Sequence, residues 1–384
     1  MSDHAHPVRD VPIRAAALAT ALAYGVTLPG LPEAVSQAGL GPAGTGQLMA
    51  VYGAAVVIAA PLCGRACRRW PITRVVQIGL LGQVLALALH ALPPGMLTLT
   101  VARAVLGIFA AAVLVALPMQ VTGPECEGSL REHRLSRISR AAIIGGLFGP
   151  AVGGLASTGP SLANAAAAGA AVLITAGVFY ARTPHALPVK ACVPAPSVHT
   201  RHRLLIALAA LAAAAMALYE VGVATHGPAM FDLTTRALGA MFAGCGIVML
   251  LVQMSVFRRG HDPLTAFAWA APAFLAMALA LLVLVQASDI AWAWAGLVLV
   301  GAASGVLLPS LAYWAGRAAG PAAAASQGWR TAFITCGQAL GSLAGSYAFS
   351  TGASGRWVLV AIVVLLMLAS TGAFIIRHRP AALA

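Results

Sequence analysis

The chain has 384 residues, of which 60% are hydrophobic and only 9% are charged, and its formal net charge is +13. This composition excludes a disordered chain, which needs low hydrophobicity, and argues against a soluble enzyme, in which about 25% of residues are charged. The basic residues gather in short gaps between long apolar stretches, which is the pattern of membrane loops and not of a nucleic-acid-binding face. The sequence therefore predicts an all-α membrane protein that binds no nucleic acid.

Twelve apolar stretches follow one another along the chain, each near the length of about 20 residues that a helix needs to cross a bilayer. They are expected at residues 12–31, 44–63, 74–92, 96–118, 140–157, 162–181, 203–226, 237–257, 264–286, 290–313, 329–350 and 356–376. The longest polar gap divides these spans six and six. We therefore expect an N-terminal six-helix bundle over 1–181, a cytoplasmic central loop over 182–202 and a C-terminal six-helix bundle over 203–384.

The two halves show sparse internal similarity. At an offset of 193 residues, Gly46, Ala50, Gly53 and Arg65 match Gly239, Ala243, Gly246 and Arg258. At an offset of 195 residues, Tyr24-Gly25-Val26 matches Tyr219-Glu220-Val221. Duplicated six-helix halves are a recurrent transporter architecture in which substrate binds between the repeats, so we predict two six-helix pseudo-repeats.

The positions of the basic residues predict the orientation. Arg103 lies inside a span, and only Arg236 and Arg356 fall on the side opposite to the remaining Lys and Arg residues if the N-terminus is cytoplasmic. Such an excess of positive charge marks the cytoplasmic side. We expect a multi-pass protein of the bacterial plasma (inner) membrane with both termini in the cytoplasm.

The fifth span carries the most specific motif, because residues 145–154 read Gly-Gly-Leu-Phe-Gly-Pro-Ala-Val-Gly-Gly. Small residues four positions apart let helix backbones approach, and a proline bends the helix. The fixed positions of the pattern GxxxGPxxGG are filled by Gly145, Gly149, Pro150, Gly153 and Gly154. This pattern is the antiporter motif of the twelve-helix drug:proton antiporter branch of the major facilitator superfamily, which the chain resembles.

Three weaker matches support the resemblance. Leu22 with Pro29 and Pro32 resembles the first-helix motif of that branch, and Arg103 with Gly107 resembles its fourth-helix motif. The loop after the second span resembles the cytoplasmic gate loop of the superfamily through Arg65, Arg68 and Arg69, although Gly64 replaces the usual Asp. The resemblance implies a transporter that moves a small-molecule substrate and protons across a lipid bilayer, and we expect it to be a monomer. The scattered cysteines and histidines indicate no metal site, and no phosphate-binding loop is present, so we expect no cofactor.

Only Arg103 among the basic residues and Glu220 among the acidic ones lie well inside a span. A charge at the centre of a membrane helix costs about 2.5–3.5 kcal/mol and therefore marks function by default. At a rise of about 1.5 Å per residue, Tyr24, Arg103 and Glu220 lie at one depth, on helices that line the central cavity in the superfamily. Our hypothesis is that Glu220 carries the proton and Arg103 takes part in the coupling; the alternative is a static ion pair that pins two helices.

Polar side chains of other spans are candidates for the substrate cavity. They are Tyr24, Thr27, Tyr52, Tyr219, Gln253, Ser304, Gln338 and Tyr347. Because this set offers few hydrogen-bonding groups, it suits an amphipathic solute. We expect a proton-coupled secondary transporter that exports small amphipathic molecules by alternating access, and not an enzyme. The alternatives are a siderophore or other natural-product exporter, a proton symporter, and a non-transporting membrane receptor or scaffold.

Overall fold

The computed structural model describes residues 10–121, 128–157, 162–182, 200–256, 268–319, 327–351 and 353–378. Within these ranges the chain forms helices and no strand. The helices of the first half are α1 (Asp10–Gly25), α2 (Leu31–Gln37), α3 (Gly44–Arg69), α4 (Ile72–His90), α5 (Met96–Val121), α6 (Gly128–Ala156) and α7 (Ala163–Ala181). Those of the second half are α8 (Thr200–Phe231), α9 (Thr235–Val256), α11 (Ala270–Val285), α12 (Ile290–Ala319), α13 (Gln327–Ser350) and α14 (Ala353–His378).

Each of the twelve predicted spans coincides with one of these helices, so the predicted fold class is confirmed. Eight of the described helices are long and apolar enough to cross a membrane, and three shorter ones are also apolar. The twelfth, α13, has 24 residues and a stripe of glycine, serine and glutamine along its length. The remaining helix, α2, is a short segment between the first two spans.

The first span is shorter than predicted. Residues 12–31 were expected to form one helix, but α1 ends at Gly25, and the chain turns through residues 26–30 before α2 begins. Pro29 has no N–H to donate, and it disfavours the helical conformation for the residue before it, Leu28. Pro32 lies in the first turn of α2, and Gly39, with φ 70°, lies beyond its end. Proline at the start of a helix and glycine after its end are common at helix termini.

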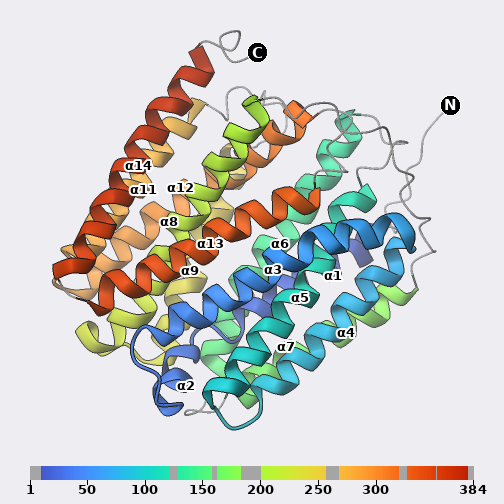
Figure 1. The fold of residues 1–384 in the computed structure, drawn as a ribbon, viewed down its shortest axis with the longest axis horizontal. Helices are drawn as coiled ribbons and strands as arrows, with labels where there is room; N and C mark the ends of the chain where they lie inside the picture. Colours follow the sequence, from blue (N-terminus) through green and yellow to red (C-terminus); the bar gives the residue numbers. More distant parts are fainter. Residues whose placement is uncertain are drawn as a thin grey trace.

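The helices fall into two groups, blue to green and yellow to red in Figure 1. One apolar cluster is built from residues between 205 and 373, and another from residues between 13 and 180 together with Ala332. The groups meet where α3 packs on α13, side by side in the middle of Figure 1, and where α6 packs on α9. The predicted central loop lies largely outside the described residues.

Rows of close glycine contacts repeat in the two halves. In the first half, a methyl group added to a glycine of α6 would press on a carbonyl oxygen of α1, or of Val26 just after it, at three successive turns. The pairs are Gly145 on Leu18, Gly149 on Leu22 and Gly153 on Val26. In the second half, the same contacts join α13 to α8: Gly337 on Ala210, Gly341 on Ala214 and Gly345 on Leu218. Both members of every pair are shifted by 192 residues, so the duplication is a property of the packing.

This register confirms one predicted offset and corrects the other. Gly46 on α3 packs on Ser342 and Ser346, and its counterpart Gly239 on α9 packs on Pro150 and Gly154, which agrees with the offset of 193. The offset of 195 for the first span was wrong, because the contacts of α1 and α8 with their glycine rows are related by 192 residues. Tyr24 and Tyr219 are therefore not equivalent positions.

Candidate functional site

Three of the predicted residues meet between α1, α3 and α5. The rings of Tyr24 and Tyr52 lie 4.6 Å apart, centroid to centroid, and are tilted by 39°. The Cζ atom of Arg103 lies 6.0 Å from the centroid of the Tyr24 ring, at the outer limit of a cation–π contact. Gly107, one turn beyond Arg103, lies against the carbonyl oxygen of Tyr52, so the missing side chain lets α5 approach α3 and brings Arg103 to the tyrosines.

The Arg103 side chain is fully enclosed by protein. It is 0% exposed, and its Nε, Nη1 and Nη2 atoms have no hydrogen-bond partner among the residues that the structure describes. Removing an ion from water costs several kcal/mol unless an opposite charge and hydrogen bonds compensate it. Arg103 is therefore a buried charge without compensation in this conformation.

Glu220 on α8 belongs to the same region but does not pair with Arg103. Its side chain is only partly buried. The phenol of Tyr24 is near enough to both Arg103 and Glu220 to interact electrostatically with each of them. Tyr24, Tyr52, Arg103 and Glu220 together are called the central layer below.

Two residues of this region were not singled out from the sequence. His90 at the end of α4 is 1% exposed and interacts electrostatically with Arg103. Its Nδ1 atom lies 2.8 Å from the carbonyl oxygen of Ala86 and donates to it, while its Nε2 atom has no partner. Cys245 on α9 lies close to Glu220 and is buried. A histidine at the end of an apolar span was the only sequence signal for the first, and the buried cysteine gave none.

The other predicted cavity residues fall into two groups: three are buried side chains that remain candidates, and two tyrosines point away from the central layer. Thr27 donates to the carbonyl oxygen of Tyr24 at 3.4 Å, and Gln253 and Ser304 are buried with a side-chain oxygen that has no partner. Tyr219 is not brought to the central layer, because it faces α12 and donates to the carbonyl oxygen of Ala293 at 2.6 Å. Tyr347 is 50% exposed and lies on the exposed side of α13.

Gln338 is exposed although it does not lie on the outer side of α13. On α13 it lies between the glycine row that faces α8 and the row of Thr335, Ala339 and Ser342 that faces α3. At 100° per residue it points away from the exposed apolar side of this helix, yet its side chain is exposed. Ser342 and Ser346, one and two turns further along α13, are buried.

The antiporter motif packs on both halves. Gly145, Gly149 and Gly153 face α1, and Pro150 lies against Gly25 of that helix. Gly154 faces the other way, onto Gly239 of α9. The motif is therefore part of a contact between the halves. The predicted gate-loop residues Arg65, Arg68 and Arg69 are exposed in the last turns of α3.

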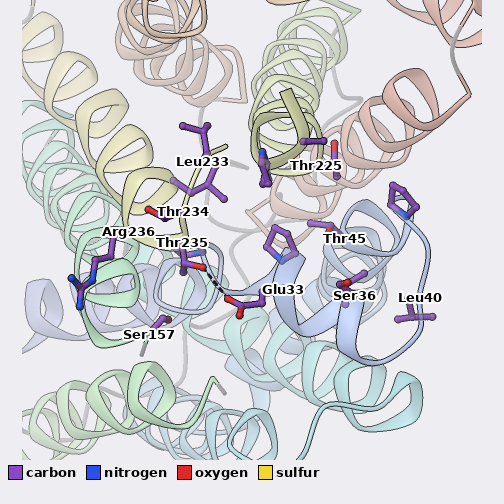
Figure 2. Close-up of a pocket in the computed structure, with 18 of the residues that line it drawn as sticks. Glu33, Ser36, Leu40, Thr45, Ser157, Thr225, Leu233, Thr234, Thr235 and Arg236 are labelled. Carbon is purple, nitrogen blue, oxygen red and sulfur yellow. Dashed lines mark hydrogen bonds between the residues drawn. The ribbon is translucent and has the colours of Figure 1, made fainter. Parts of the chain in front are cut away.

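A cavity of about 1080 Å³ lies where the α1–α3 connection meets α8 and the start of α9 (Figure 2). We call it the vestibule. Its walls include Glu33 of α2, Thr45 of α3, Thr225 of α8, and Thr235 and Arg236 of α9. The Oγ1 atom of Thr235 donates to Oε2 of Glu33 at 3.1 Å, a bond between the two halves that Figure 2 shows as a dashed line.

An apolar cluster separates the vestibule from the central layer. It includes Leu48, Leu99, Val221 and Phe242, which we call the plug, and all four are buried. Along α3, Thr45 lines the vestibule, Leu48 belongs to the plug, and Tyr52 belongs to the central layer. Along α9, Leu238, Phe242 and Cys245 follow the same order. The molecule is closed on this side of Arg103.

Among the residues that the structure describes, no group of three or more His, Cys, Asp or Glu side chains is placed to hold a metal ion.

Comparison with known proteins gives the family. No curated protein matches the sequence. The human organic anion transporter MFSD10 (TETRAN) has a similar structure, with a TM-score of 0.78, 18% identity, and coverage of 96% of this chain and 99% of that one. A mutant of the nucleoside transporter NupG (TM-score 0.68, 14% identity, coverage 95% and 99%) and a mutant of the peptide transporter POT (0.74, 14%, 100% and 97%) are also similar. At these identities the likeness shows the fold alone.

The model of the Major Facilitator Superfamily matches residues 15–328, which is most of the chain. The family model, the twelve helices and the two halves agree. The chain belongs to the Major Facilitator Superfamily and is a multi-pass membrane transporter, not an enzyme.

Proposed function

We propose that the chain is a proton-coupled secondary transporter that exports small amphipathic molecules by alternating access, with Glu220 as the proton carrier. The observation that carries the proposal is the central layer, in which the carboxyl group of Glu220 and the guanidinium group of Arg103 both act on Tyr24 but do not pair with each other within the described residues. Intramembrane charges that face the interior of a transporter typically serve its coupling.

Alternating access is supported by the difference between the two ends. The vestibule end is closed by the plug, whereas Gln338 is exposed on the interior side of α13. Arg236, which the charge distribution assigns to the outer side, lines the vestibule. With that assignment the conformation faces the cytoplasm and both termini are cytoplasmic. We further propose that the membrane is the bacterial inner membrane.

The proton cycle follows from the separation of the two charges. In the conformation seen here Glu220 and Arg103 are apart. Rocking of the halves brings α5 and α8 into a different relation, so that the guanidinium stabilises the carboxylate in one state and not in the other. A proton is then bound on one side of the membrane and released on the other, while the GxxxGPxxGG contacts of α6 with α1 and α9 transmit the movement.

The test is proton-driven flux in proteoliposomes that contain monomeric full-length protein. The probes are a matched naphthyl series: 1-naphthalenesulfonate (anion), 1-naphthalenesulfonamide (neutral) and 1-naphthyltrimethylammonium (cation). We expect an imposed pH gradient to drive flux of at least one member above that of protein-free vesicles. Glu220→Gln should fold but lose the dependence on the gradient, because it cannot exchange a proton.

Asp289→Asn is the matched control, since Asp289 is an exposed acid that caps α12 through Ala291 and an amide preserves that acceptor. It should keep coupled flux. Unchanged coupling in Glu220→Gln contradicts the assignment of the proton carrier. Protons that move with the solute and not against it identify a symporter, and the absence of any flux supports a receptor or scaffold.

A further inference from the structure

We infer that Arg103, together with the phenol groups of Tyr24 and Tyr52, binds the negatively charged head group of the transported molecule, so that the substrates are amphipathic organic anions. The inference rests on the proposed transport function and names its substrate class. It is carried by a buried side chain whose hydrogen-bonding groups are all unused.

Around Arg103, hydrogen-bond donors outnumber acceptors. A guanidinium group has five N–H donors and no acceptor, and none of its nitrogen atoms has a partner. Tyr24 and Tyr52 add two hydroxyl groups that make no hydrogen bond within the described part of the chain. The one nearby ring donor, Nδ1 of His90, is already bonded to Ala86. A ligand that satisfies this site must bring acceptor oxygens.

The charges point to the same ligand. The groups that interact electrostatically with Arg103 are Tyr24 on α1, Tyr52 on α3 and His90 on α4, and none of them is a carboxylate. Glu220 acts on Tyr24 but does not compensate Arg103. The positive charge is therefore left for the substrate to balance. Carboxylate, sulfonate and phosphate groups match the planar fork of arginine and bind it through charge-assisted hydrogen bonds.

The surroundings of the head-group site are apolar. Leu48 and Leu99 lie one turn from Tyr52 and Arg103 on the vestibule side, and the ring of Tyr24 lies 6.0 Å from the guanidinium carbon of Arg103. An apolar body on the anion would pack against these side chains and gain from leaving water. Arg103 itself is closed off in this conformation, while Tyr24 keeps an exposed edge. The head group reaches Arg103 along Tyr24 when the halves move.

The experiment measures equilibrium binding by fluorescence anisotropy of the naphthyl series to full-length protein in lipid nanodiscs. We expect 1-naphthalenesulfonate to bind at least about 10-fold more tightly than the sulfonamide, a ratio typical of one charge-assisted contact. Methanesulfonate, which has the head group without the apolar body, should compete only weakly. Arg103→Gln should bring the ratio close to 1, and Arg103→Lys should keep an intermediate ratio.

Arg236→Gln serves as the control for long-range attraction, because Arg236 is exposed in the vestibule, and it should leave the ratio unchanged. A wild-type preference for the cation, or a ratio that survives in Arg103→Gln, overturns the inference. Methanesulfonate that competes as well as the naphthyl anion overturns its amphipathic part. Coupled flux without a preference for the anion contradicts this inference alone. Anion binding without gradient-driven flux contradicts the proposed proton coupling but not the anion-binding site.

Discussion

Arg103 combines three properties at the residue scale: a full charge, complete burial and no hydrogen-bond partner. A side chain that only stabilised the fold would not be kept in this state, because a hydrophobic residue of similar size avoids the desolvation cost. Stability and function therefore make opposite demands on this position. A substitution can separate them.

We predict that Arg103→Met raises the midpoint of thermal unfolding of the purified protein, by an amount that corresponds to about 1–4 kcal/mol, since it replaces an uncompensated charge with an apolar side chain. The control is Arg330→Met. Arg330 donates to the carbonyl oxygen of Ala312 at 3.3 Å, so its loss removes a bond and should not stabilise. A lower unfolding midpoint for Arg103→Met than for the wild type would contradict the interpretation of Arg103 as a cost to the fold.

The sequence predicted the depth of the site residues better than the directions in which they point. Depth follows from counting residues along a helix, which is why Tyr24 and Arg103 were correctly placed at one level. The directions in which Tyr219 and Tyr347 point could not be predicted in this way. Their spans are apolar on nearly every side, so the hydrophobic periodicity gives no direction. Only the contacts with α12 and the exposed side of α13 reveal it.

At the scale of helices, the glycine rows determine how closely α6 and α1 approach, and the same holds for α13 and α8. In a membrane, helices associate mainly through close packing, since lipid is as apolar as the side chains. The rows also explain why the repeat was faint in the sequence. The contacted group is a backbone carbonyl, so Leu18 and Ala210 serve equally well and no side-chain identity is retained.

Neighbouring glycines in the antiporter motif allow a direct test. Gly145→Ala places a methyl group against the carbonyl oxygen of Leu18, whereas Gly146→Ala meets no atom within 4 Å. We expect Gly145→Ala to destabilise the protein by about 1–3 kcal/mol through overpacking. Gly146→Ala should be neutral or stabilising by up to about 1 kcal/mol, because alanine favours a helix.

The measurement is the thermal unfolding midpoint of each variant in the same detergent. Equal midpoints for the two variants would show that the glycine row is not a packing surface. The comparison is clean because both residues lie in one helix and the substitution is the same. Loss of transport in Gly145→Ala with normal stability would assign the row to the movement and not to the fold.

At the scale of the whole molecule, the two pseudo-repeats pack their helices in the same way, but the two ends of the molecule differ, because the plug closes the vestibule end. The sequence was sufficient to predict two six-helix halves, because composition and span count carry that information. The vestibule and plug were beyond it, since Leu48, Leu99 and Phe242 are ordinary residues of apolar spans until α3, α5 and α9 are brought together. Glu33 was one of several acids near a helix end, and its bond to Thr235 joins positions 202 residues apart.

The bond between Glu33 and Thr235 holds the halves together at the vestibule end, so breaking it should favour opening on that side. We predict that Thr235→Val raises the population open to the vestibule by about 2- to 12-fold, the effect of losing a hydrogen bond of about 0.5–1.5 kcal/mol. Cys245 is a natural reporter, because it is buried next to Glu220 and lies one turn beyond Phe242 of the plug. In a variant that keeps only this cysteine, the rate of labelling by a membrane-impermeant thiol reagent applied from the vestibule side should rise by the same factor.

Ser36→Ala, which alters another vestibule residue, should leave the rate unchanged. A labelling rate that Thr235→Val does not alter would mean that the plug, and not this bond, keeps the vestibule end closed.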